Sequence, residues 1–188
     1  MKRRLALVLT CLLAMPAWAA WDIGQLMQGL AAQKGGRATF VEKKYLAMLD
    51  SPVTSSGELV FIPPARLERR TFKPRPETVV LDGGTLTMTR GERQMVLQLQ
   101  DHPALGALTE SIRATLAGDR QALERHFVLK LEGTQARWSL LLTPREARTR
   151  AWVLEIRIGG ERGEVRTVEI EQSDKDRSVM TITKVAGS

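Results

Sequence analysis

The sequence contains little of the chemistry on which catalytic and metal sites depend. Of its 188 residues, one is cysteine and two are histidine. Cys11 lies in an N-terminal segment that we expect to be removed, so the mature chain has no disulfide framework, thiol nucleophile or sulfur ligand. A zinc site would depend on carboxylates, because His102 and His126 lack the HxxxH or HExxH spacing of a helical zinc site. We therefore predict no metal centre.

Motifs for nucleophilic and phosphate chemistry are also missing. No GxSxG sequence presents a serine nucleophile, and Ser111 is predicted on the polar side of a helix. The glycine pairs lack the spacing of phosphate loops and are typical of turns. Nothing in the sequence brings together an acid–base pair from the candidate carboxylates Glu68, Asp82, Glu92 and Asp101. The sequence predicts a protein that is not an enzyme and uses no cofactor.

The chain has no apolar run long enough for a membrane-spanning helix, which needs ~20 residues. Its longest run, Leu5–Met15, follows Lys2-Arg3-Arg4 and precedes Ala17-Trp18-Ala19, the order of a secretory signal peptide. Twin-arginine and lipoprotein signals fit the same segment less well. We expect cleavage after Ala19, which leaves residues 20–188 as a single soluble domain in the periplasm.

The chain also lacks a strong excess of positive charge after cleavage. Lys and Arg number 28 against 21 Asp and Glu, and removal of the three basic residues in the signal lowers the net charge from +7 to +4. Acidic residues are interspersed among the arginines, whereas a nucleic-acid-binding protein concentrates its basic residues on one stripe or helix. We expect no nucleic-acid partner.

Three segments have the one-sided apolar pattern of helices. Asp22 can cap a first helix, which Gly35-Gly36 ends. Pro103 suits the first turn of a second helix, and Asp119 can cap a short third one that runs to His126. The second helix has an apolar stripe made of Leu105, Leu108, Ile112 and Leu116.

The rest of the chain has the pattern of short strands, with turn residues about every eight to twelve positions. Strands are predicted at 38–46, 57–62, 66–72, 79–81, 86–89, 94–99, 128–131, 138–142, 153–158, 165–171 and 179–183. Few helices separate them, so the sheet should be antiparallel. A sheet of this size curls. We predict an α+β fold, a curled antiparallel sheet (an incomplete β-barrel of about ten or eleven strands) with helices covering its concave side.

Residues 57–86 carry a specific resemblance. Gly57–Ile62, Pro64, Leu67, Pro74 and the hairpin Val79–Leu86 follow one another with the spacing of a family signature. This order resembles the LolA-type outer-membrane lipoprotein carriers, in which a Gly-x-Leu strand, a proline-led strand and a second proline lead into an Asp-Gly hairpin. Residues 165–182, around an Asp-x-x-Arg-Ser turn, are similar to the closing strands of that family.

The resemblance implies an incomplete barrel whose hydrophobic cavity is covered by helices. It implies a periplasmic carrier, here expected to be a monomer, that takes acylated lipoproteins from an inner-membrane releasing complex to an outer-membrane acceptor. Such a carrier needs no cofactor, because an apolar groove stabilises an acyl chain by ~0.8 kcal/mol for each CH2 removed from water.

Two departures from the family pattern concern the lid and the cavity wall. The family often has an arginine directly before the first proline, proposed to latch the lid by hydrogen bonds, whereas this chain has Pro63. The family's aromatic residue two positions after that of Leu67 is Arg69 here. Alternation along the strand places Leu67, Arg69 and Thr71 on one face. Arg69 then points either along the rim to solvent or into the cavity toward an anionic head group.

The resemblance and the strand alternation give a set of candidate ligand-binding residues: Leu59, Phe61, Leu67, Arg69, Leu86, Met88, Met95, Leu97, Leu105, Leu108, Ile112 and Leu116. The two departures favour a divergent member that carries a lipid or another acylated product. Two other interpretations stay open, a periplasmic lipid-sensing or regulatory module and a structural envelope protein with a solid core.

Overall fold

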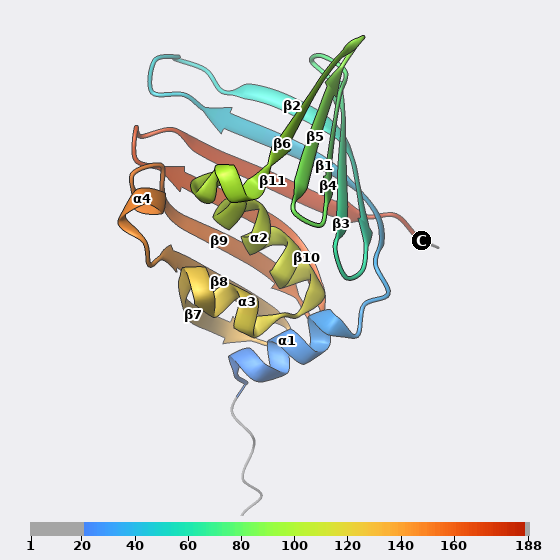
Figure 1. The fold of residues 1–188 in the computed structure, drawn as a ribbon. Coiled ribbons are helices and arrows are strands. Elements are labelled where there is room, and N and C mark those ends of the chain that lie inside the picture. The colour runs from blue at the N-terminus through green and yellow to red at the C-terminus, as the bar shows by residue number, and fades with distance from the viewer. Residues whose placement is uncertain (1–20, 187–188) are drawn as a thin grey trace, which may run out of the picture.

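The computed structural model describes residues 21–186 and contains one antiparallel sheet of eleven strands. In sheet order they are β6-β5-β4-β3-β2-β1-β11-β10-β9-β8-β7. The edge strands β6 and β7 do not pair with each other, so the curled sheet is not closed into a barrel (Figure 1). The predicted fold class is confirmed. The predicted signal peptide, residues 1–19, lies outside the described residues.

The strands have the order that the turn pattern predicts, six before the second helix and five after the third. Their bounds are β1 Gly36–Tyr45, β2 Val53–Ile62, β3 Arg66–Lys73, β4 Glu77–Asp82, β5 Thr85–Arg90, β6 Arg93–Gln98, β7 Phe127–Thr134, β8 Arg137–Pro144, β9 Val153–Glu161, β10 Glu164–Gln172 and β11 Arg177–Lys184.

The helices are α1 Ile23–Ala31, α2 Pro103–Ala117, α3 Arg120–His126 and the short α4 Ala147–Arg150, with a 3-10 turn η1 at Leu99–Asp101. Asp22 caps α1 as predicted, because its carboxylate accepts the Gln25 backbone N–H at 2.8 Å. α1 nevertheless ends at Ala31, before Gly35. The sequence did not predict α4, since four residues are too few to show a helical pattern.

Helix α2 runs inside the curl of the sheet, while α1 and α3 lie beside it against the β7–β9 half (Figure 1). α2 contacts both of these helices. Gly118 ends α2 in the left-handed conformation, with a φ of 66°. A Cβ at this position would lie 2.3 Å from the Met27 carbonyl oxygen, so the close approach of α2 to α1 requires glycine.

The two ends of the sheet carry different connections. One end holds the five connections 46–52, 74–76, 91–92, 145–152 and 173–176. We call these segments, each with the strand residue on either side, the loop end. The opposite end holds four turns of two or three residues, 63–65, 83–84, 135–136 and 162–163.

No helix within residues 21–186 combines the length and the apolar character needed to cross a membrane.

Candidate functional site

A cavity of about 340 Å³ lies between α2 and the concave face of the sheet. Its walls come from the C-terminal end of α1, from α2, and from inward side chains of strands on both halves of the sheet. Most of these side chains are aliphatic. Its volume lies at the lower end of the range of about 300–1,000 Å³ typical of small-molecule sites.

Eight of the twelve residues predicted from the sequence line this cavity, namely Leu59, Phe61, Leu67, Arg69, Leu86, Leu108, Ile112 and Leu116. The other four, Met88, Met95, Leu97 and Leu105, are not among the lining residues. Met88 and Met95 follow Arg69 and Val79 in the same cross-strand row, and Leu97 is paired with Leu86. These three therefore share the inward face but lie on β5 and β6, toward the edge of the sheet.

One wall of the cavity comes from β10 and β11 near the end of the chain, and none of its residues was predicted. Val165, Val168 and Ile170 of β10 and Met180 and Ile182 of β11 all line the cavity. Their apolar alternation is visible in the sequence. Their position is not, because it depends on the pairing of β1 with β11, in which Phe40 faces Ile182 across 142 residues of chain.

Helix α2 presents small side chains to the protein interior and large ones to the cavity. Its buried residues are Ala107, Ser111, Ala114 and Thr115. Ser111 was predicted on a polar face, which is wrong: its hydroxyl is buried and donates to the Leu108 carbonyl oxygen at 2.6 Å. This internal hydrogen bond satisfies the hydroxyl without water. The small face allows close packing and leaves Leu108, Ile112 and Leu116 to face the cavity.

Arg69 lies on the cavity wall and is paired with a carboxylate. Its Nη2 is 2.6 Å from Glu42 Oε2, and its guanidinium carbon lies 4.7 Å from the centre of the Phe40 ring. The Arg69 side chain is 32% exposed and that of Glu42 16%. Ser55 donates to the same Glu42 oxygen at 3.1 Å. Arg69 thus faces inward, and its charge is balanced by the protein itself.

The neighbouring arginines of β3 lie on the other face of the strand. Arg66 pairs with Asp82 at 2.9 Å and Arg70 with Glu68 at 2.6 Å. The hydrogen bond and the charge of Glu68 raise the pKa of the Arg70 guanidinium. The three arginines of β3 therefore all pair with carboxylates of the protein, and of these three only Arg69 lines the cavity.

A second polar group of lining residues lies near the turn 162–163. Lys184 Nζ is 3.1 Å from Glu164 Oε1 and 3.4 Å from Gln33 Oε1. Lys184, Glu164 and Gln33 all line the cavity, as does Arg37. The apolar wall is thus bounded by an ion pair on two sides, Glu42–Arg69 and Glu164–Lys184.

Arg113 connects α2 to the turn that begins the proline-led strand. Its Nη1 donates to the Pro64 carbonyl oxygen at 2.9 Å, and its Nε and Nη2 donate to Glu110. The hydrogen bonds to Glu110 raise the pKa of the Arg113 guanidinium, so it stays charged. The residue before Pro64 is Pro63, and the arginine that contacts this turn comes from the helix instead.

The structure offers no metal site within residues 21–186. No three His, Cys, Asp or Glu side chains in this range lie together as a metal-ligand set. His102 is an exposed residue at the start of α2 and makes no capping hydrogen bond through its side chain.

The chain resembles known proteins in sequence pattern and in fold. A family model described as outer membrane lipoprotein carrier protein LolA-like matches residues 14–187. The structure of a DUF1329 family protein from Desulfovibrio piger matches with a TM-score of 0.51 and 10% identity, covering 89% of this chain and 92% of that one. At this identity the likeness shows the fold alone.

Two further solved structures match less closely. A LolA superfamily protein from Nitrosomonas europaea has a TM-score of 0.47 and 10% identity, covering 88% of this chain and 93% of that one. The MucA/MucB complex of Pseudomonas aeruginosa matches with a TM-score of 0.46 and 15% identity, covering 87% of this chain and 56% of that one. No curated protein sequence matches the chain.

Proposed function

This chain belongs to the family of LolA-like outer membrane lipoprotein carrier proteins, and on that premise we propose that it binds the acyl chains of a lipoprotein, or of a related lipid, in the cavity beneath α2. The observation that carries the proposal is the cavity itself. It lies between α2 and the concave face of the sheet and is lined mainly by aliphatic side chains, whereas a purely structural protein would be expected to fill this space with a solid core.

The cavity wall supplies the physical basis for binding. An acyl chain that enters it is removed from water, which is worth ~0.8 kcal/mol for each CH2. Leu59, Phe61 and Leu67 on the strands and Leu108 and Ile112 on α2 would form opposite sides of the acyl site. The binding step breaks and forms no covalent bond, so the protein acts as a carrier and no catalytic group or cofactor is needed.

The finer parts of the proposal concern location and traffic. We propose that residues 1–19 are an export signal, that residues 20–188 act as one binding domain in the periplasm, and that the cargo passes from an inner-membrane releasing complex to an outer-membrane acceptor. N-terminal sequencing of protein recovered from the periplasm should begin at Ala20-Trp21. An intact signal on most molecules would contradict this location.

Binding is tested by mass spectrometry of the purified protein and by titration with a fluorescent fatty acid. We expect a co-purified acyl species and saturable binding with one site. Ile112→Trp, which would fill the cavity from α2, should abolish the titration while the far-ultraviolet circular dichroism spectrum is unchanged. Val128→Trp is the matched control on an exposed position outside the cavity. Absence of both acyl ligand and fatty-acid binding in the unmodified protein would refute the proposal.

A further inference from the structure

The loop end exposes large apolar side chains that the fold does not bury. They are Tyr45, Met48, Leu49, Val53 and Trp152. Met48 is 86% exposed and Trp152 68%. At the opposite end of the sheet, the large apolar side chains that stay exposed are Ile62 and Val185. A single exposed apolar residue is ordinary on a protein surface, but a group of them at one end marks an interaction site.

Hydrogen bonds connect the two loops that carry most of these exposed residues to the turn between them. The backbone N–H of Ala47 donates to Asp176 Oδ1 at 2.9 Å, and the N–H of Ser173 donates to the Trp152 carbonyl oxygen at 3.2 Å. The turn 173–176 therefore supports the Met48 loop on one side and Trp152 on the other. β1 and β9 are three strand spacings apart in the sheet, roughly 15 Å, so both loops can meet one surface together.

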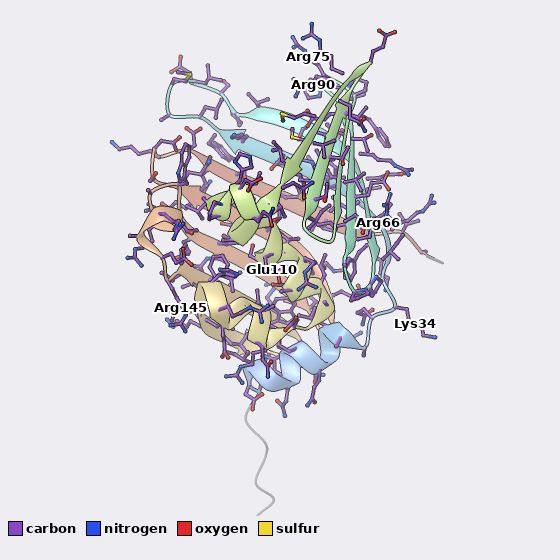
Figure 2. The ribbon with its side chains drawn as sticks, in the orientation of Figure 1. Lys34, Arg66, Arg75, Arg90, Glu110 and Arg145 are labelled. Carbon is purple, nitrogen blue, oxygen red and sulfur yellow. The ribbon has the colours of Figure 1, made fainter. Side chains whose placement is uncertain are left out.

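The same end carries the excess of basic residues. The loop end has nine Lys and Arg against six Asp and Glu, whereas the four turns at the opposite end, counted in the same way, have three against three. Figure 2 places Arg75, Arg90 and Arg145 along the loop-end side of the sheet and Lys34 on the other. Lys175, in the turn between the two apolar loops, is exposed.

Exposed tryptophan and aliphatic side chains beside basic residues match the chemistry of an anionic bilayer surface. Indole rings favour the interface between head groups and acyl chains, and Lys and Arg extend their charged ends toward phosphate. We propose that the loop end docks on the surface of an anionic phospholipid membrane, with Met48, Leu49 and Trp152 entering the interface. This docking surface is separate from the cavity and does not depend on acyl binding there.

Vesicle co-sedimentation tests the proposal, with vesicles of phosphatidylcholine alone and of equal parts phosphatidylcholine and phosphatidylglycerol. We expect stronger binding to the anionic vesicles, weakened by salt. The double substitution Met48→Ser with Leu49→Ser should lower affinity about tenfold, since both lose an apolar contact with the interface. Ile62→Ser is the matched control at the opposite end and should leave binding unchanged.

The charge contribution is measured with Lys44→Gln, beside the Met48 loop, and Lys175→Gln, in the turn between the two apolar loops. Each should lower affinity for anionic vesicles about fivefold, because a basic side chain near such a surface contributes roughly 1 kcal/mol. Lys34→Gln is the matched control and should have no effect. Brominated lipids should quench the fluorescence of Trp152, and Trp152→Phe should remove that quenching while vesicle binding persists.

A cavity variant separates docking from cargo binding. Leu108→Ser should lower fatty-acid affinity and leave vesicle binding unchanged. Equal loss of vesicle binding in Ile62→Ser and in the Met48/Leu49 variant would overturn the proposal. The proposal would also be overturned if the unmodified protein did not bind anionic vesicles. This holds even if the same surface were found to bind another protein.

Discussion

The two halves of the curled sheet are filled in different ways. Strands β7 to β9 pack directly against the helices, and Leu123, Phe127, Leu140 and Ile156 are fully buried in this region. Strands β2 to β4 face α2 across the cavity, and the inward side chains of Leu59, Phe61, Leu67 and Val79 stay partly exposed. Among the described residues, the main core cluster contains none from β2 to β6.

The difference shows that strand sequence alone does not decide between a core and a cavity. Both halves alternate apolar and polar residues, and both present their apolar face to the concave side. The two halves of the sheet differ in their distance from the helices. This distance depends on the small side chains that α2 buries. Ala107, Ala114 and Gly118 hold α2 close to its helical neighbours, so its larger side chains stand opposite β2 to β4 with space between.

The largest expected effect is on stability, in the packed half. Leu140→Ala should lower the free energy of unfolding by about 2–5 kcal/mol, because Leu140 is fully buried and its removal leaves a void. Leu59→Ala is the matched substitution on the cavity half and should cost less than about 2 kcal/mol. Urea unfolding measures both. Equal losses would mean that the two halves are packed alike.

The next effect is on ligand affinity, in the cavity half. Leu108→Ser removes part of the α2 wall, so affinity for a fluorescent fatty acid should fall about tenfold, equivalent to roughly 1.4 kcal/mol. The loss of stability should stay below the ~2–5 kcal/mol of a packed leucine. Leu123→Ser, at a fully buried position of α3, should instead cause the full loss of stability expected for a packed leucine. If Leu108→Ser causes the full loss of stability and the unmodified protein binds no acyl chain, α2 is an ordinary core helix.

A smaller effect is expected where α2 meets the turn between β2 and β3. Arg113→Lys keeps the positive charge but cannot reach both Glu110 and the Pro64 carbonyl oxygen with the planar geometry of arginine. We expect a loss of about 1 kcal/mol in unfolding free energy and faster release of a bound fatty acid in stopped-flow measurements. Arg120→Lys, an exposed arginine of α3, is the control. Unchanged release would show that the Pro64 contact does not hold α2 in place.

The smallest effect concerns head-group selectivity. Arg69→Leu should weaken binding of a fatty acid about threefold to fivefold, or ~1 kcal/mol or less, and leave the corresponding fatty alcohol unchanged. Because this change leaves Glu42 unpaired, the double variant Arg69→Leu with Glu42→Gln is needed to remove carboxylate repulsion. Arg70→Leu, on the other face of β3, is the matched control. If acid and alcohol respond alike in all three variants, Arg69 only supports the wall.

The helices and the strand order were predictable from the sequence because their signals are local. Asp22, Pro103 and Asp119 mark helix starts, and turn residues separate strands at short intervals. Contacts between distant segments were not predictable. Nothing near Arg69 in the sequence indicates Glu42 as its partner, since the pair forms only when β2 lies between β1 and β3.

The candidate cavity residues were predictable only in part, for the same reason. Alternation placed Leu59, Leu67 and Arg69 on the inward face correctly, but it gave Met88 and Met95 equal rank although they lie nearer the sheet edge. Helical periodicity likewise grouped Leu105 with Leu108. It also placed Ser111 on a polar face, because a small hydroxyl side chain that bonds to its own helix leaves no apolar signal in the sequence.

The open edges of the sheet have a consequence for the size of the cargo. In a closed barrel, strand number and stagger fix the internal diameter. Here no ladder of hydrogen bonds joins β6 to β7, so the two halves can move apart without breaking any backbone pair of the sheet. The width of the cavity is then set by side-chain contacts of α2, which adjust more easily than backbone pairing. On the proposed function, acyl chains of different length or number would then fit the same fold at little structural cost.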